Sequence, residues 1–485
     1  MSPQKSKKSF REMDLTTGKL FWKIPLFALP MALTTMLQLL YTTVDLWTVA
    51  NFGGGSSSMA AVGSNGSMIN LIVTVFVSLS LGANVAIANA KGSGRKEHAE
   101  KVMHTSLLLA AILGVVVGIF GVFISPHLLR WMGTIDSIIE KATLYLTIYF
   151  IGLPFQMIYN YSSQIMRALG DSRRPLAILA VSGLTNVLFD LLFVILFKMD
   201  VAGVAIATVI SEAVAAAISI AVLMNNRSGF IRFSFKKLGF DHTSLVEVVR
   251  IGLPAGIQGL CFCIPNVLIQ SSLYTITEAE YSVEYIVNGA AASGQIESYI
   301  FALVEAVSAA CVAFTGQNYG AAKKDNVRKV FWYCQIWNAI SMGLAAIVAL
   351  TMGDYLLRLF LNSKDPAELV QEIGAGKQRL YLFAFTYVLD GIMDVCGSYA
   401  RGMKYSTPPA VITFFGCTVS RIIFLLTIFK LPEFHTVFWL YAAFPISWVI
   451  VDLVYIPVTL VIEKKAFGKL ATRPIGDGTL ETGRM

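Results

Sequence analysis

Long apolar stretches alternate with short polar ones along this chain. Windows of about 20 apolar residues, the length of helix that crosses a bilayer, recur twelve times. We expect helices near residues 25–51, 60–90, 103–125, 142–168, 175–198, 202–225, 250–275, 288–317, 330–352, 376–402, 408–430 and 437–462. The pattern predicts an all-α membrane protein with twelve transmembrane helices.

Composition supports this class. The chain is 55% hydrophobic and 14% charged, with a mean hydropathy of +0.66, whereas soluble domains carry roughly 25% charged residues. Residues 1–23 are polar and basic, so we expect no secretory leader. The six cysteines lie in or near apolar stretches without metal-type spacing. The net charge of +8 is spread over loops, which argues against a nucleic-acid partner.

Most lysine and arginine residues fall on the cytoplasmic side of the membrane when the N-terminus is placed in the cytoplasm. The segments then assigned to the inside hold 29 of the 38 basic residues. The outer segments hold eight: Arg130, Lys141, Lys198, Arg358, Lys364, Lys377, Arg379 and Lys430. Because cytoplasmic loops are enriched in Lys and Arg, we expect a multi-pass plasma-membrane protein with both termini cytoplasmic.

The two halves of the sequence resemble each other. KGSGRKEHAEKV (91–102) aligns with YGAAKKDNVRKV (319–330), and RALGDSRRP (167–175) aligns with RGMKYSTPP (401–409). This order predicts two six-helix lobes related by a parallel internal repeat, an arrangement found in transporters. The predicted parts are an N-terminal segment (1–24), an N-lobe (25–225), a cytoplasmic linker (226–250), a C-lobe (251–463) and a C-terminal tail (464–485).

Polar residues interrupt the predicted fifth helix. In LTNVLFDLLFVILF (184–197), Asn186 and Asp190 lie four residues apart among Leu, Val, Ile and Phe, so they share one helix face. A carboxylate in a bilayer is costly and marks an ion or proton route more often than a structural contact. A neutral Asp190 that hydrogen-bonds another helix is the alternative.

Four stretches are similar to the multidrug and toxic compound extrusion (MATE) family. They are IPLFALPMALTTMLQLLYTTVD (24–45), NLIVTVFVSLSLGANVAIANAKGSG (70–94), RALGDSRRP (167–175) and FTGQNYGAAKKDNVRKV (314–330). The resemblance runs from about residue 20 to residue 460. It implies a two-lobe secondary transporter that exports cationic and amphipathic drugs by antiport with protons or sodium ions.

The same resemblance implies a coupling-cation site in the N-lobe. Its members would be Asp45, Asn186, Asp190, Tyr145 and Thr208, with Tyr149 as a rival for the tyrosine. An amide carbonyl and two carboxylates are ligands that Na⁺ accepts, so Asp45, Asn186 and Asp190 could hold it. The same carboxylates could instead carry a proton. We expect no other cofactor.

Other acidic residues also fall within predicted helices. They are Glu212, Glu297, Glu305, Asp390, Asp394 and Asp452, against a single predicted in-span base, Arg421. This excess favours cationic substrates. We expect Arg421 to pair with Asp390 or Asp394 in a C-lobe charged network that includes Glu297 and Glu305. A transport role and a purely structural ion pair both stay open.

Several function classes are disfavoured. The sequence has no Walker loop, HExxH or GxSxG motif, so we expect neither an ATP-driven pump nor an enzyme. A lipid-linked oligosaccharide flippase of the same broad fold is the alternative, but it should carry more cavity-lining Arg and Lys to bind pyrophosphate. A channel is a third class. We expect a monomer in the lipid bilayer that binds small, drug-like molecules.

Overall fold

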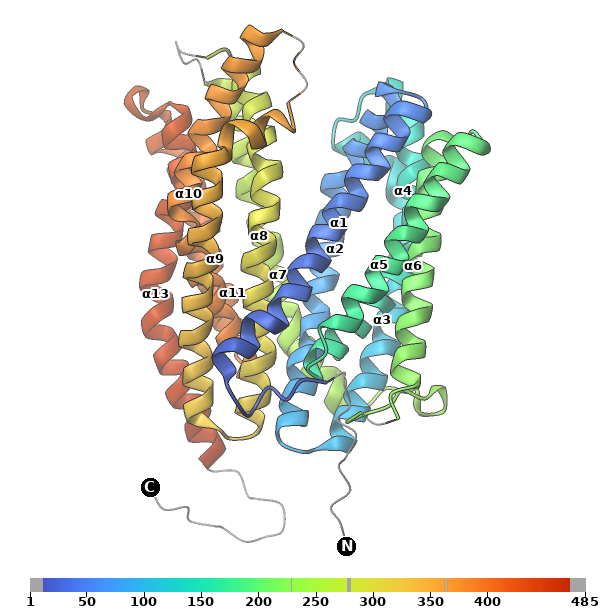
Figure 1. Ribbon diagram of the computed structural model, residues 1–485, viewed down its shortest axis with the longest axis vertical. Helices are drawn as coiled ribbons and strands as arrows, with labels where there is room; N and C mark the ends of the chain where they lie inside the picture. Colours follow the sequence, from blue (N-terminus) through green and yellow to red (C-terminus); the bar gives the residue numbers. More distant parts are fainter. Residues whose placement is uncertain (1–11, 228, 277–280, 362, 364, 472–485) are drawn as a thin grey trace, which may run out of the picture.

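A computed structural model describes residues 12–227, 229–276, 281–361, 363 and 365–471; the outer parts of the predicted terminal segments, 1–11 and 472–485, lie outside this range. All its regular elements are helical (Figure 1). The α-helices are α1 (Leu20–Phe52), α2 (Ser56–Gly92), α3 (Lys96–Trp131), α4 (Asp136–Ala168), α5 (Arg173–Asp190), α6 (Asp200–Met224), α7 (His242–Ser272), α8 (Val283–Gly320), α9 (Lys324–Arg358), α10 (Pro366–Gly402), α11 (Thr407–Thr413), α12 (Ser420–Leu426) and α13 (Val437–Ala471).

Twelve spans in the described part are long and apolar enough to cross a membrane, as predicted. Short helical segments complete two of them. The π-helix η1 (Leu191–Leu196) continues α5, and the π-helix η4 (Phe414–Val419) joins α11 to α12. The predicted class, an all-α multi-pass membrane protein, is therefore confirmed.

Most helices are longer than hydropathy predicts. The predicted linker 226–250 is too long, because α7 already begins at His242. The Asp241 side chain there accepts a hydrogen bond from the Ser244 backbone N–H at 2.8 Å and caps the helix. At the other end of the chain, α13 extends to Ala471, into the predicted tail. Hydropathy detects only the part of a helix that crosses hydrocarbon, and polar turns extend beyond it.

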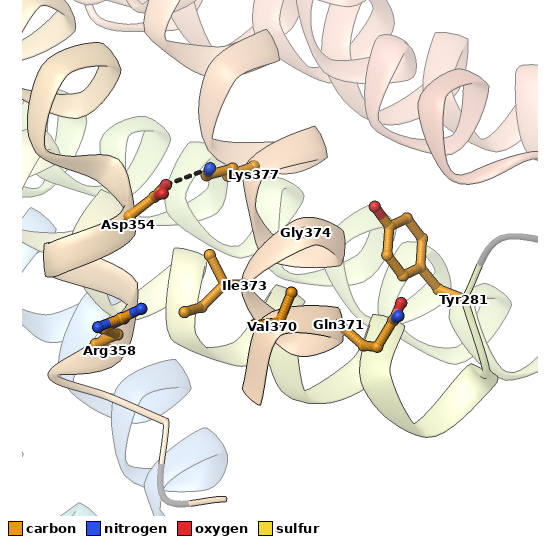
Figure 2. A pocket seen from close by; sticks show the side chains of 8 residues that line it. All are labelled: Tyr281, Asp354, Arg358, Val370, Gln371, Ile373, Gly374 and Lys377. Atoms are coloured by element: carbon orange, nitrogen blue, oxygen red, sulfur yellow. Dashed lines mark ion pairs between the residues drawn. The ribbon is translucent and has the colours of Figure 1, made fainter. Parts of the chain in front are cut away.

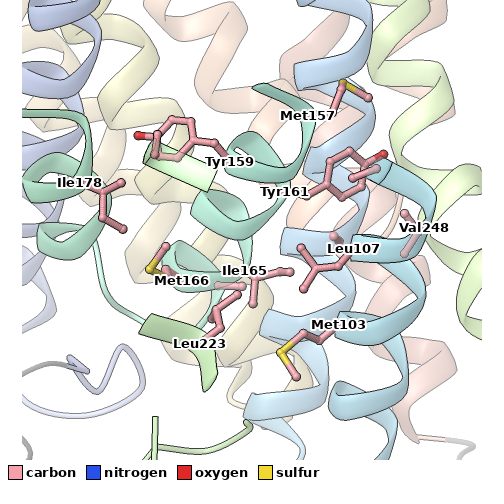
Figure 3. Close-up of a cluster of buried hydrophobic side chains, with 14 of the residues drawn as sticks. Met103, Leu107, Met157, Tyr159, Tyr161, Ile165, Met166, Ile178, Leu223 and Val248 are labelled. Carbon is pink, nitrogen blue, oxygen red and sulfur yellow. The ribbon is translucent and has the colours of Figure 1, made fainter. Parts of the chain in front are cut away.

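Each half of the chain has its own apolar core. Side chains of α2 to α6 form one core, joined by Val248 of α7 (Figure 3). Side chains of α7 to α13 form the other. We call the end of the bundle where α1 begins and α13 ends the lower end, as in Figure 1. The ribbons of the two halves meet there and diverge toward the upper end (Figure 1).

The two halves meet through reciprocal glycine contacts between α2 and α8. A Cβ on Gly92 would collide with the Gln317 carbonyl oxygen, and a Cβ on Gly320 would collide with the Asn89 carbonyl oxygen. Gly92 corresponds to Gly320 in the sequence repeat, and Asn89 corresponds to Gln317. Equivalent residues therefore exchange equivalent contacts, as an approximate two-fold axis between the halves requires.

The segment before α1 ties both halves together at the lower end. Met13 donates its backbone N–H to the Gly170 carbonyl of the first half at 2.9 Å. Two residues later, the Leu15 side chain is fully buried and its carbonyl accepts a hydrogen bond from Asn318 of the second half at 2.9 Å. The first turns of α1 also pack in a core with α8, α9, α10 and α13.

Candidate functional site

The predicted N-lobe residues come together in the interior of the first half. Asp45 of α1 lies beside Asn186 and Asp190 of α5 and beside Thr208 of α6. Asp190 is 0% exposed, Asn186 4% and Asp45 8%. The i, i+4 spacing of Asn186 and Asp190 aims both side chains at α1, so two distant segments of the sequence form one site.

Several oxygens of this site have no hydrogen-bond partner in the structure. They are Oδ1 of Asp45, Oδ1 of Asn186 and both carboxylate oxygens of Asp190. Buried polar atoms are nearly always paired, so each exception needs an explanation. These oxygens fit a hard monovalent cation or a shared proton. In the described part of the chain, no group of three or more His, Cys, Asp or Glu side chains is placed to hold a metal ion.

The two candidate tyrosines occupy different positions on α4. Tyr145 is buried in an apolar cluster with residues of α1 and α6 and lies near Asp45 and Asp190. Tyr149, one turn on, accepts a hydrogen bond from Gln156 Nε2 at 2.7 Å and lies near Glu212. Tyr145 thus lies beside the two aspartates, and Tyr149 lies near Glu212.

The hydroxyl of Thr208 is already engaged. It donates to the Val204 carbonyl of its own helix at 3.0 Å, as threonines in helices often do. An oxygen lone pair remains available, so Thr208 can still face a cation bound at Asp45.

Each half carries a π-helix in its fifth span, which hydropathy cannot reveal. In the first half the π-helix begins directly after Asp190, and in the second it ends two residues before Arg421. π-Helical turns are rare and occur often at functional sites. Asp190 and Arg421 therefore each lie next to a π-helical turn.

A buried ion pair of the second half joins Glu297 of α8 to Arg379 of α10. Two hydrogen bonds of 2.7 Å connect the guanidinium to the two carboxylate oxygens. The charge distribution assigned Arg379 to an outer loop, but it lies within α10 with its side chain 16% exposed. The expectation of a single in-span base is therefore wrong. Arg379 is tolerated inside the bundle because the buried carboxylate of Glu297 on α8 compensates its charge.

Arg421 does not form the predicted ion pair. Among the described residues, neither Asp390 nor Asp394 comes within ion-pair distance of it. Its Nε instead donates to Ser447 Oγ at 2.8 Å, and the guanidinium carbon lies 4.3 Å from the ring centre of Phe444. Arg421 is 2% exposed. The guanidinium therefore contacts a hydroxyl, the Asn266 amide oxygen and an aromatic ring, while Asp390 interacts with it electrostatically without forming an ion pair.

Asp390, Asp394 and Arg421 still share one cavity of about 310 Å³ with the Glu297–Arg379 pair. Its aromatic lining comprises Phe262, Phe301, Phe383, Phe444 and Trp448. Glu305 is not part of this cavity, contrary to the predicted C-lobe network. It lies two turns after Glu297 on α8 and turns toward the first half.

Glu305 instead lines a cavity of about 420 Å³ within the first half, together with Arg167 and Glu212. Arg167, at the lower end of α4, lies near Glu305. Nothing in the sequence pattern distinguishes Arg167 from the other bases of its loop motif, RALGDSRRP. Its contact with an acid of the other half depends on how the halves are packed.

A further pocket lies at the upper end of the second half, between α9, α10 and Tyr281 (Figure 2). An ion pair joins Lys377 to Asp354, whose side chain is 59% exposed. None of the predicted site residues lines this pocket.

Comparisons with known proteins agree with this architecture. The MatE family model matches residues 30–192 and 271–427. The probable multidrug resistance protein YpnP of Bacillus subtilis is 28% identical, and the match covers 80% of this chain and 84% of YpnP. The probable multidrug resistance protein NorM of Thermotoga maritima is 25% identical over 81% and 82% of the two chains. A FAD transporter of Shewanella oneidensis is 23% identical over 62% and 66%.

Solved structures share the fold. A MOP superfamily transporter from Pyrococcus furiosus, described as having a binding pocket of reverse polarity, superposes with a TM-score of 0.84 at 20% identity, covering 93% of this chain and 98% of that one. An outward-facing MATE family multidrug resistance transporter superposes with a TM-score of 0.82 at 22% identity, covering 95% and 98%.

Proposed function

The chain belongs to the MatE family of membrane transporters, and from that premise we propose that it is a secondary active exporter of organic cations and amphipathic compounds. Protons or sodium ions moving inward would drive export. The plasma membrane would hold the protein as a monomer with both termini in the cytoplasm. The relatives named as multidrug resistance proteins support the substrate class.

One observation carries this proposal: Asp45 and Asp190 face each other inside a bilayer-spanning bundle with oxygens that have no partner. Two buried carboxylates repel each other unless a proton or a cation lies between them. Binding of a proton or a cation is therefore coupled to the packing of α1 against α5. An antiporter needs such a coupling between ion binding and helix packing.

The arrangement of the halves fits alternating access. The halves are joined at the lower end by the segment before α1, by the α2–α8 contacts and by a hydrogen bond of 2.8 Å between His98 Nε2 of α3 and the Glu247 carboxylate of α7. With the termini in the cytoplasm, the structure would represent the outward-facing state. Transport then requires these lower contacts to open while the upper ends close.

An efflux assay tests the function. Protein in vesicles loaded with ethidium should release the dye when a proton gradient or a sodium gradient is imposed. Collapsing one gradient at a time identifies the coupling ion. Dye release that continues after both gradients are removed would contradict secondary active transport.

The flippase alternative finds less support in the cavities. We call the cavity that Asp390, Asp394 and Arg421 share the C-half cavity. Among its described residues, Arg379 pairs with Glu297, and Arg421 packs on Phe444. Arg167 lies near Glu305 in the other cavity. No cluster of free bases, as a pyrophosphate needs, lines either described cavity.

A further inference from the structure

The cavity of the first half differs in character from the cavity of the second. All but four of its lining residues are polar or charged, the exceptions being Val73, Val77, Leu179 and Ala215. Its side chains include the amides Gln38, Asn70, Gln156, Asn160 and Gln164 and the hydroxyls Thr34, Thr35, Thr74, Ser78, Ser163 and Ser182. Pockets for drug-like molecules are mostly apolar and aromatic with a few polar groups. Half of the residues that line the C-half cavity are apolar, five of them aromatic, whereas this cavity is lined mainly by polar side chains.

The polar cavity also has an uncompensated acid. Arg167 is the one base among the described residues that line it, and it lies near Glu305. Glu212 of α6 has no ion pair with any base in the described part of the chain, and Gln156 is its polar neighbour. A ligand with a positive charge would therefore meet a carboxylate at Glu212 that no base of the described chain neutralises.

Glu212 lies close to the coupling site. It follows Thr208 by four residues on α6, which places it about one helical turn (~6 Å) nearer the lower end. Gln156, its neighbour, donates to Tyr149, and Tyr145 lies one turn from Tyr149 beside the two aspartates. A cation at Glu212 would repel a second cation at Asp45 and Asp190, since low-dielectric surroundings screen charges poorly. That repulsion would make the substrate and the coupling ion exclude each other.

We propose that this cavity binds a polar amine, a ligand whose ammonium group pairs with Glu212 and whose hydroxyl or amide groups bond to the side chains of α1, α2 and α4. The proposal rests on the proposed export function and names the substrate class of its N-half cavity. An apolar aromatic cation fits the C-half cavity better. In the polar cavity of the first half, the apolar surface of such a cation would leave the hydrogen-bonding groups of the lining without partners.

Three matched probes test the proposal by calorimetric binding to the purified full-length protein. N-methylglucamine carries an amine and a row of hydroxyls. Sorbitol keeps the hydroxyls without the amine, and N-methylhexylamine keeps the amine without the hydroxyls. We expect N-methylglucamine to bind at least about tenfold more tightly than either comparison molecule, because a hydrogen bond to a charged group is worth roughly that factor.

Two substitutions assign the binding to this cavity. Glu212→Gln should reduce the affinity for N-methylglucamine to that for sorbitol. Asn160→Leu should narrow its advantage over N-methylhexylamine, because one hydrogen-bonding side chain is lost. The matched acid-to-amide control is Glu284→Gln, at an exposed position at the upper end of α8, and it should change nothing. If Glu212→Gln does not fold, Asn160→Leu and the three probes still test whether this cavity binds a polar amine.

The proposal is overturned if N-methylhexylamine binds as tightly as N-methylglucamine, if Glu212→Gln keeps the preference, or if none of the three probes binds. These measurements need no gradient. Failure of the export function would instead appear as gradient-independent dye release in vesicles, so the two failures are distinguishable.

Discussion

At the scale of single residues, Asp190 is the clearest link between sequence and function. It is fully buried, both its oxygens lack partners, and Asp45 of a different helix lies beside it. An amide at this position would keep the shape and one acceptor oxygen, but it could neither release a proton nor neutralise a cation.

Asp190→Asn should therefore abolish gradient-driven ethidium efflux while the protein remains folded in the membrane. Asp45→Asn should behave alike, and the double variant should be little worse than either, because residues that share one site are not additive. Vesicle efflux and size-exclusion profiles measure the two properties. Full efflux in Asp190→Asn would make the residue structural, and loss of folding in both single variants would favour a buried polar network.

The pair of Glu297 and Arg379 makes a second prediction at this scale. Glu297→Gln leaves a buried guanidinium uncompensated, which costs about 3–5 kcal/mol. We expect a large fall in the apparent unfolding temperature, measured by intrinsic fluorescence in detergent. The double change Glu297→Gln with Arg379→Met should recover part of it.

The neighbouring ion pair between Asp354 and Lys377 supplies the control. Because Asp354 is exposed, Asp354→Asn should cost less than about 1 kcal/mol. Equal losses of stability in Glu297→Gln and Asp354→Asn would show that burial does not decide the strength of these pairs.

At the scale of helices, glycines set how closely the two halves approach. A Cβ on Gly252 of α7 would collide with the Leu79 carbonyl oxygen of α2, and one on Gly82 of α2 would collide with the Val248 carbonyl oxygen of α7. The collisions involve backbone atoms, which cannot rotate away. This crossing therefore depends on having no side chain at either position.

Gly252→Ala should push α7 away from α2 and destabilise the protein by about 1–3 kcal/mol, the usual cost of overpacking. The matched control is Gly343→Ala within α9, where an added Cβ meets no atom within 4 Å. That change should be neutral or stabilising by about 0.5–1 kcal/mol, since alanine favours helices. Thermal unfolding of both variants checks the prediction, which fails if Gly252→Ala is the more stable of the two.

At the scale of the whole molecule, polar contacts join the two halves at the lower end. His98 Nε2 of the first half lies 2.8 Å from the Glu247 carboxylate of the second half, and Glu247 also pairs with Lys404 of its own half. Transport by alternating access requires such contacts to break in each cycle.

A short, reducible bis-methanethiosulfonate linker between cysteines at positions 98 and 247 should therefore block efflux, and a reductant should restore it. The control is the same linker between positions 141 and 200, whose native side chains pair at 2.9 Å within the first half. That linker should leave efflux intact, because both residues move together. Unchanged efflux with the first linker would contradict opening at the lower end.

Orientation in the membrane is a separate whole-molecule prediction. A cysteine in place of the exposed Lys236, between α6 and α7 at the lower end, should react only with thiol reagents that reach the cytoplasm. A cysteine in place of the exposed Ser57, at the start of α2, should react from outside intact cells. Reversed labelling would place the termini outside.

The sequence by itself determined the twelve spans, the repeat and the polar residues Asp45, Asn186 and Asp190. The spans, Asn186 and Asp190 follow from local chemistry, because apolar length fixes a membrane helix and a carboxylate in an apolar helix is conspicuous wherever the helix packs. Asp45 came from the family resemblance, and the repeat came from aligned motifs. Motif glycines such as Gly92 and Gly320 were likewise visible as a repeat, although their mutual contacts were not.

Only the tertiary structure decided which charged groups meet. Arg379 pairs with Glu297, Arg421 packs on Phe444, and Glu305 turns into the cavity of the other half. Each outcome depends on the rotation and tilt of helices that are distant in sequence. Hydropathy and spacing place a residue on a helix, but they do not fix which neighbouring helix its side chain faces, because that depends on the packing of the whole bundle.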